Sequence, residues 1–193
     1  MGEAGKYNIF YISNQPLYTE QEINELNEHI DNCKIRQERE DAAAIGANKK
    51  SRVSVITWLE IKEQLKKLET LLFDVNLKYF KYDLVPIDDT HFVNINDYDS
   101  DNSSYDWHID CNQYPSKYDM KITCLLNLSS EKYEGGELLL SGIIGKEKEL
   151  LDTQFGKPGF ALLFTSYRQH KVTPVIKGSR RTLSYWSRGP AWR

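Results

Sequence analysis

The sequence predicts an α+β fold that is mainly β, and three observations lead to this prediction. From His91 to the C-terminus, short runs of β-forming residues alternate with turns of Asp, Asn, Ser, Gly and Pro, as in a sandwich or barrel. Helix-like spacing of apolar residues is confined to the first 80 residues. The 193 residues contain no internal repeat or linker, which suits one domain. We therefore predict a single domain, 1–193: a double-stranded β-helix (jelly roll, cupin-like) at about residues 90–193, buttressed by N-terminal helices at about residues 19–80.

The N-terminal part is predicted to begin with a strand at residues 7–12, which a Ser-Asn-Gln-Pro turn ends. A helix begins after Thr19, because Glu22 three residues later completes a capping box. Its apolar stripe is Ile23, Leu26, Ile30 and Cys33. Residues 36–50, which are charged and then rich in Ala and Gly, indicate a frayed helix followed by a mobile loop. A longer helix is predicted over residues 57–79, with apolar positions at Trp58, Ile61, Leu65, Leu68, Leu72 and Val75.

Beyond Pro86 the sequence changes to short alternating runs, each bounded by turn residues. Each run is predicted to be a strand, because successive side chains of a strand point to opposite faces. The runs cover residues 91–96, 121–128, 137–140, 160–164, 171–176 and 182–186.

Composition narrows the classes of function. The chain is 40% hydrophobic and 27% charged, as in soluble globular proteins, and no apolar run approaches the roughly 18 residues of a membrane span. The N-terminus lacks the features of a secretory signal, so we expect a cytoplasmic protein. Three cysteines without paired spacing argue against a disulfide framework and a zinc site. A net charge of −3 disfavours nucleic acid as a partner.

Residues 105–110, Tyr-Asp-Trp-His-Ile-Asp, contain the pattern on which the prediction of function depends. In an extended strand, His108 and Asp110 would emerge on one face. His-x-Asp alone is a weak pattern, because an isolated histidine is usually an ordinary core or surface residue. A second histidine from a distant strand, His170, would complete two nitrogens and one carboxylate around a metal ion. This set is the facial triad of non-haem Fe(II) oxygenases, which leaves coordination positions open for ligands and dioxygen.

Several further motifs occur in a fixed order. They are Tyr98 followed after nine residues by His108-Ile109-Asp110, the run Tyr133-Glu134-Gly135-Gly136-Glu137-Leu138, the segment from His170 through Gly178 to Arg180, and the closing pair Gly189-Pro190. This series resembles the 2-oxoglutarate/Fe(II) oxygenases of prolyl-hydroxylase type, and within them the PKHD-type hydroxylases of bacteria and phages. The resemblance covers about residues 50–193, and nothing is carried over to residues 1–49.

The resemblance implies that His108, Asp110 and His170 bind Fe(II) and are catalytic. It implies 2-oxoglutarate and O2 as cosubstrates, with ascorbate as a supporting reductant, in a bacterial or phage-infected cell. The expected reaction hydroxylates an unactivated C–H bond and releases succinate and CO2. Because related halogenases have a small residue in place of the carboxylate, Asp110 favours hydroxylation.

Cosubstrate binding is expected at Arg180, whose guanidinium has the planar donor fork that suits the distal carboxylate of 2-oxoglutarate. Thr182 would share its strand face and add a hydroxyl donor, whereas Arg181 would point the other way, as an exposed arginine. Tyr98 matches a family tyrosine that bonds the cosubstrate, although it could also be a half-buried aromatic residue. Asn127 departs from the eukaryotic branch, in which a cosubstrate-binding tyrosine lies on this strand.

The family suggests a prolyl residue of a peptide or protein as the substrate. Candidate substrate contacts are Tyr105, Trp107 and Tyr167, and two further tyrosines near the ligands are Tyr114 and Tyr118; any of them could instead belong to the core. Alternatives are a free amino acid or other small metabolite, oxidative demethylation of nucleic acid, which the net charge disfavours, and a non-catalytic cupin-like binding module. The complete triad and Arg180 argue against the last of these.

Overall fold

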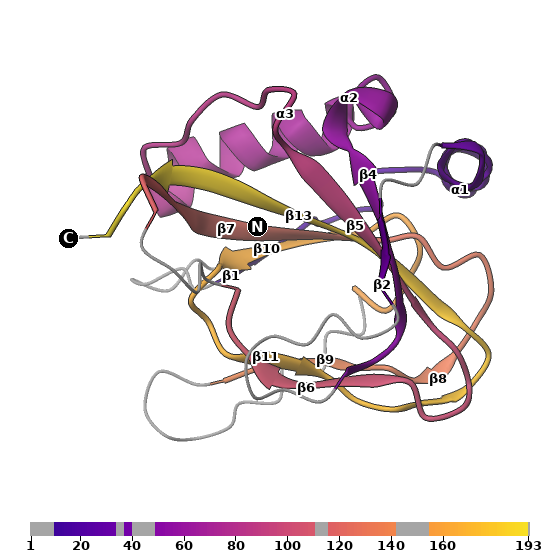
Figure 1. Cartoon of the computed structure of the whole chain (residues 1–193). Helices are drawn as coiled ribbons and strands as arrows, with labels where there is room; N and C mark the ends of the chain where they lie inside the picture. The colour runs from indigo at the N-terminus through magenta and orange to yellow at the C-terminus, as the bar shows by residue number, and fades with distance from the viewer. Residues whose placement is uncertain (1–9, 34–36, 40–48, 111–115, 142–154, 193) are drawn as a thin grey trace.

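The computed structural model describes residues 10–33, 37–39, 49–110, 116–141 and 155–192. It contains two antiparallel sheets that face each other, with the helices on the outer face of the larger one (Figure 1). The major sheet has the strand order β1 (Phe10–Ile12), β10 (Ala161–Thr165), β7 (Tyr118–Asn127), β13 (Arg180–Pro190), β5 (Phe92–Tyr98), β4 (Arg52–Thr57) and β2 (Gln37–Arg39). The minor sheet has the order β3 (Lys49–Lys50), β6 (Ser104–His108), β11 (His170–Val172) and β9 (Leu138–Leu140). A two-stranded ribbon pairs β12 (Val175–Lys177) with β8 (Glu134–Gly135). This arrangement confirms the predicted mainly β, jelly-roll fold.

The first helix, α1 (Glu20–Asn32), begins where the sequence predicts. The Thr19 hydroxyl accepts a hydrogen bond from the Glu22 backbone N–H at 3.3 Å, and the Glu22 carboxylate accepts the Thr19 backbone N–H at 2.9 Å. The capping box therefore satisfies donors that the first turn of a helix leaves unpaired.

The prediction of one continuous helix at residues 57–79 is wrong. The structure has α2 (Trp58–Ile61), α3 (Lys66–Val75) and a π-helix, η1 (Asn76–Phe80), in its place. The π-helix ends at Lys81, whose backbone is left-handed (φ 59°), and the Asn76 side chain bonds both backbone groups of Tyr82 at 2.9–3.0 Å. Because a side chain satisfies the backbone after the wide turn, the chain can leave the helix there.

The frayed helix predicted within residues 36–50 is also wrong where the structure describes it. Gln37–Arg39 pairs with β4, and Lys49–Lys50 pairs with β6. Residues 40–48, and residues 7–9 of the predicted first strand, lie outside the described residues. The charged composition of residues 37–39 gave no local strand signal, because their pairing depends on β4, a strand that lies beyond the next segment of the sequence.

The side chains of β13 alternate between the two faces of the major sheet. Leu183 and Tyr185 lie in the buried cluster beneath the helices, whereas Arg180, Thr182 and Ser184 face the minor sheet. Leu125, Phe164 and Val172 belong to a second apolar cluster between the sheets. The space between the sheets thus combines an apolar cluster with a row of polar side chains.

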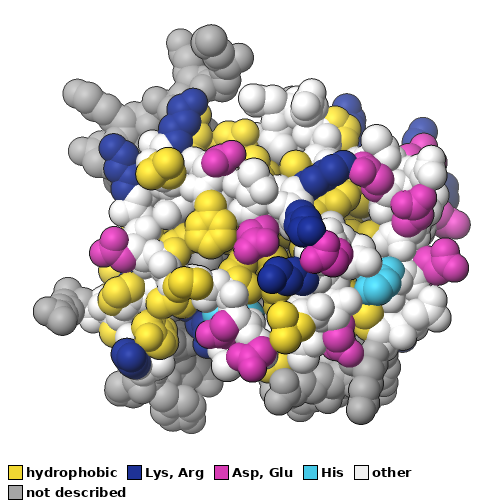
Figure 2. All heavy atoms as spheres, turned by 90° about the horizontal axis from the view of Figure 1, so that it is seen from above, with side chains coloured by type: hydrophobic (Ala, Val, Ile, Leu, Met, Phe, Trp, Pro, Cys, Tyr) yellow, Lys and Arg dark blue, Asp and Glu magenta, His cyan; other side chains and the backbone are white. Residues whose placement is uncertain are grey.

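The predicted run at residues 171–176 forms two strands, β11 and β12, because Pro174 lacks a backbone N–H and interrupts the ladder. On the helix-bearing side, acidic and basic side chains are interspersed with apolar ones (Figure 2). Within the described residues, no helix has the length and apolarity needed to cross a bilayer.

Candidate active site

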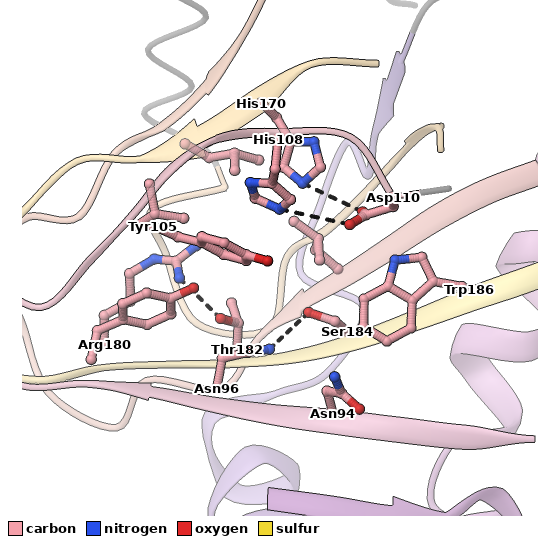
Figure 3. Close-up of a pocket in the computed structure, with 14 residues that line it drawn as sticks. Asn94, Asn96, Tyr105, His108, Asp110, His170, Arg180, Thr182, Ser184 and Trp186 are labelled. Atoms are coloured by element: carbon pink, nitrogen blue, oxygen red, sulfur yellow. Dashed lines mark hydrogen bonds and ion pairs between the residues drawn. The ribbon is translucent and has the colours of Figure 1, made fainter. Parts of the chain in front are cut away.

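Two neighbouring strands of the minor sheet bring the predicted ligands together. His108 ends β6, His170 begins β11, and the two are direct partners in the strand register. Asp110 lies two residues beyond β6, where its backbone N–H donates to the Ser166 carbonyl at 2.8 Å. One ligand atom from each of the three residues lies within 4.8 Å of the others. The three side chains therefore form a compact cluster, in the upper part of Figure 3.

Backbone carbonyls set the orientation of both imidazole rings. Nδ1 of His108 lies 2.8 Å from the Asp106 carbonyl, and Nδ1 of His170 lies 2.9 Å from the Arg168 carbonyl. A carbonyl only accepts, so each Nδ1 carries a proton, and Nε2 is left as the nitrogen that can offer a lone pair to a metal ion. Both Nε2 atoms face Asp110. This is the usual orientation of metal-binding histidines.

The spacing and the donor set fit a metal ion. Nε2 of His108 is 3.6 Å from Oδ1 of Asp110, and Nε2 of His170 is 3.4 Å from Oδ2. These separations are too long for good hydrogen bonds. Two ligands that lie about 2.1 Å from one ion at right angles are about 3 Å apart, close to the observed spacing. Two imidazoles and one carboxylate are the donors that non-haem Fe(II) sites use.

The triad opens onto a cavity of about 200 Å³ between the two sheets. Its walls come from both sheets, and its labelled side chains converge in Figure 3. The lining consists of Asn94, Asn96, Tyr98, Tyr105, His108, Asp110, Leu125, Leu138, His170, Val172, Arg180, Thr182, Ser184 and Trp186.

Arg180 is one of the most deeply buried side chains of the cavity, with 2% of its surface exposed. Its Nη1 donates to the Thr182 hydroxyl at 2.9 Å, and its guanidinium lies 5.1 Å from the Tyr98 ring and 6.0 Å from the Phe155 ring. No carboxylate of the described residues forms an ion pair with it. Burial raises the pKa of the Tyr98 phenol and so favours its neutral form, whereas the positive charge of Arg180 acts in the opposite direction. This end of the cavity thus holds a buried cation without an anionic partner from the described chain.

Arg181 points to the opposite face of β13, as strand alternation predicts, but the expectation that it is an exposed arginine is wrong. Its Nε donates to Asp97 at 2.7 Å, and its Nη2 donates to Asp31 of α1 at 2.9 Å. Its side chain is 21% exposed. Arg181 therefore links α1 to the major sheet.

The structure brings only one of the three candidate substrate aromatics to the cavity. The register of β6 against β11 shifts between its two paired positions, so Tyr105 and His108 share a face although they are three residues apart, and their rings stack at 3.6 Å. Trp107 is absent from the lining, and Lys171 Nζ lies 4.9 Å from its ring.

Tyr167 does not line the cavity either. It is 54% exposed and packs edge-on against Trp192 at 5.7 Å. Tyr118 is half-buried at the start of β7 and is also absent from the lining, and Tyr114 lies outside the described residues.

Sequence reasoning missed several residues of the site. Asn94, Asn96, Ser184 and Trp186 line the cavity, and Thr123 contacts Asp110 behind it. The two-residue period that placed Thr182 beside Arg180 also places Ser184 and Trp186 on the same face, so this signal was present in the sequence. Thr123 had no such signal, because its contact depends on how β7 and the segment after β6 meet in space.

Comparisons with known proteins agree with this geometry. Residues 93–188 match the family model of the 2OG-Fe(II) oxygenase superfamily. The chain is 35% identical over 94 residues to a PKHD-type hydroxylase of Alteromonas mediterranea and 36% identical over 87 residues to one of Synechococcus. These matches cover 45% and 43% of this chain, but only 39% and 36% of the two relatives.

Solved structures share the fold at lower identity. A prolyl-4-hydroxylase of Pseudomonas putida has a TM-score of 0.66 at 14% identity, with 95% of this chain and 94% of that chain covered. A prolyl hydroxylase of Trichoplax adhaerens, solved with a peptide fragment of hypoxia inducible factor, has a TM-score of 0.65 at 19% identity, with 93% and 83% covered. The family match spans the strands that carry the triad and Arg180, and the chain belongs to the 2OG-Fe(II) oxygenase superfamily, with a fold like that of the prolyl hydroxylases.

Proposed function

We propose that this protein is an Fe(II)- and 2-oxoglutarate-dependent dioxygenase that hydroxylates an unactivated C–H bond and releases succinate and CO2. One observation carries the proposal. A cluster of two buried histidines and one partly buried carboxylate opens onto the same cavity as a buried arginine that has no carboxylate partner among the described residues. The first group suits a divalent iron, and the second suits a ligand that brings its own carboxylate.

Each residue of the site has a proposed role. His108, Asp110 and His170 hold Fe(II), which supplies the activation of O2 when it is bound. Arg180 and Thr182 bind the distal carboxylate of 2-oxoglutarate, and Tyr98 packs against the guanidinium as a neutral phenol. Because Arg180 is buried, little water competes with the carboxylate for its donors.

For the substrate, we propose a prolyl residue within a peptide or protein. Tyr105 and Trp186 supply aromatic surface in the cavity, which suits an apolar ring. Asn94 and Ser184 add neutral polar groups. Arg180 is the one cationic side chain of the described lining, and its proposed partner is the cosubstrate. A free amino acid would bring a carboxylate with no second cation to receive it, whereas a peptide-linked residue is uncharged at both ends.

The proposal can be tested by succinate release from the purified protein with Fe(II), ascorbate and 2-oxoglutarate. Proline-containing peptides with blocked termini are compared with free L-proline, and Asp110→Ala serves as the inactive control. Stimulation by blocked peptides supports a prolyl substrate, whereas stimulation by the free amino acid favours a metabolite hydroxylase. A parent protein that releases no more succinate than the Asp110→Ala variant under every condition would refute the dioxygenase.

A further inference from the structure

The carboxylate of Asp110 is held from behind by a buried hydroxyl of the major sheet. Thr123 Oγ1 donates to Asp110 Oδ2 at 2.8 Å, and the Ser166 hydroxyl lies 3.1 Å from the same Thr123 oxygen. Both residues are fully buried, with 0% of their surface exposed. We propose that Thr123 is the positioning residue that fixes Asp110 as a metal ligand and that Ser166 in turn fixes the Thr123 hydroxyl. This inference rests on the proposed metal site.

The direction of the hydrogen bonds follows from counting protons. Because the Asp110 carboxylate can only accept, the single Thr123 proton goes to Oδ2. Ser166 must then be the donor in its contact with Thr123. The chain of donors runs from Ser166 through Thr123 to Asp110, and its direction is fixed.

A second contact fixes the backbone of the same ligand. The Asp110 N–H donates to the Ser166 carbonyl at 2.8 Å, so Ser166 is linked to Asp110 both directly and through Thr123. Asp110 lies beyond the end of β6 and has no strand ladder to hold it. These two contacts therefore replace the strand in setting both where the carboxylate lies and how it is rotated.

The expected consequence is a loss of metal affinity when the Thr123 hydroxyl is removed. Hydrogen-bond partners behind metal ligands typically change metal affinity by about 10–100-fold. Without the hydroxyl, one oxygen of Asp110 has lost its donor, and the carboxylate can rotate away from the two imidazoles. Thr123→Val keeps the shape of the side chain and removes only this donor.

The experiment measures metal affinity rather than turnover. Mn(II), and Fe(II) under anaerobic conditions, are titrated into each variant in competition with a fluorescent chelator. We expect Thr123→Val to bind about 10–100-fold more weakly than the parent. Thr123→Ser should bind the metal nearly as tightly as the parent, because it retains the hydroxyl. Ser166→Ala should have a smaller effect than Thr123→Val, since it leaves the Thr123 donor in place.

Thr165→Val is the matched control. Thr165 is also buried, with 6% exposed, but its strand partner is Ile122, which packs in the cluster beneath the helices, so Thr165 faces away from the cavity. Thermal unfolding of the metal-free variants shows whether each one folds. If Thr123→Val does not fold, the metal affinities of Ser166→Ala and Thr123→Ser can still be compared with that of the parent. Equal affinities of the parent and Thr123→Val, or an equal loss in Thr165→Val, would overturn this inference. A parent that binds neither metal would instead refute the proposed metal site.

Discussion

Replacing Arg180 or Arg181 by glutamine should separate cosubstrate binding from stability. The two arginines are adjacent on β13 but face opposite sides of the sheet, so the same substitution acts in two environments. Arg180→Gln removes the buried cation of the cavity. Arg181→Gln removes the link between Asp97 and Asp31.

For Arg180, the magnitude follows from the cost of breaking a buried ion pair. Removing one partner of such a pair costs about 3–5 kcal/mol. At about 1.4 kcal/mol per tenfold, 2-oxoglutarate should bind about a hundred to several thousand times more weakly to Arg180→Gln. In the absence of the cosubstrate, this variant should be as stable as the parent or more stable, because a buried charge without a counter-ion is itself costly.

Arg181→Gln should show the opposite result. A hydrogen bond to a charged group contributes about 1.5–3 kcal/mol, and the Arg181 contact with Asp97 is largely shielded from solvent. We therefore expect a loss of unfolding free energy of about this size and almost unchanged affinity for 2-oxoglutarate.

Two measurements check this pair of expectations. Anaerobic titration of the Fe(II)-loaded variants with 2-oxoglutarate, followed by visible absorption, gives the affinities. Urea unfolding of the metal-free proteins gives the stabilities. Equal weakening of 2-oxoglutarate binding in both variants, or a larger loss in Arg181→Gln, would refute the assignment of Arg180.

Three further predictions concern the metal ligand, a turn and the acid limit of stability. Asp110→Ala should abolish Fe(II)-dependent turnover while the metal-free protein still folds; parent-like consumption of 2-oxoglutarate would contradict the triad. Gly135→Ala should destabilise the protein by at least about 2 kcal/mol in urea unfolding, because Gly135 has φ +76° and an added Cβ would lie 2.1 Å from the Pro174 carbonyl oxygen; an unchanged midpoint would show that the turn relaxes. Hydrogen bonds, chiefly from Thr90, lower the pKa of Asp88 from 3.8 to about 2. Because the pKa of Asp88 is lower in the folded than in the unfolded protein, its stabilising effect is present above about pH 4 and is lost as the pH falls towards 2. In Asp88→Asn, the unfolding free energy should therefore decline less between these pH values, which urea unfolding at a series of pH values measures.

Local patterns predicted the parts of the molecule that depend on neighbours in sequence. The capping box of Thr19 and Glu22 requires residues only three positions apart, and it was correct. The alternation along β13 separated Arg180 from Arg181 for the same reason. Features that need a more distant partner were missed. The paired residues 37–39 look like an irregular charged segment, and the end of η1 depends on the contact of the Asn76 amide with the backbone of Tyr82.

The candidate site divides in the same way. Its ligands could be named from the spacing of His108 and Asp110 and from the family order of His170 and Arg180. The direct pairing of His108 with His170 could not be read from spacing, because it depends on the register of β6 and β11. Thr123 was missed because a buried threonine in an apolar strand has the same sequence pattern whether or not it touches a ligand.

The position of Asp110 has a consequence for residues far from the metal. His108 and His170 belong to the minor sheet, whereas Asp110 is tied to Thr123 and Ser166 of the opposite wall. A bound ion would link the two sheets, so the affinity for the metal would depend on the distance between the sheets. Repacking the apolar contacts between them, at Leu125 or Phe164 for instance, would then change how much metal the protein retains without altering any ligand.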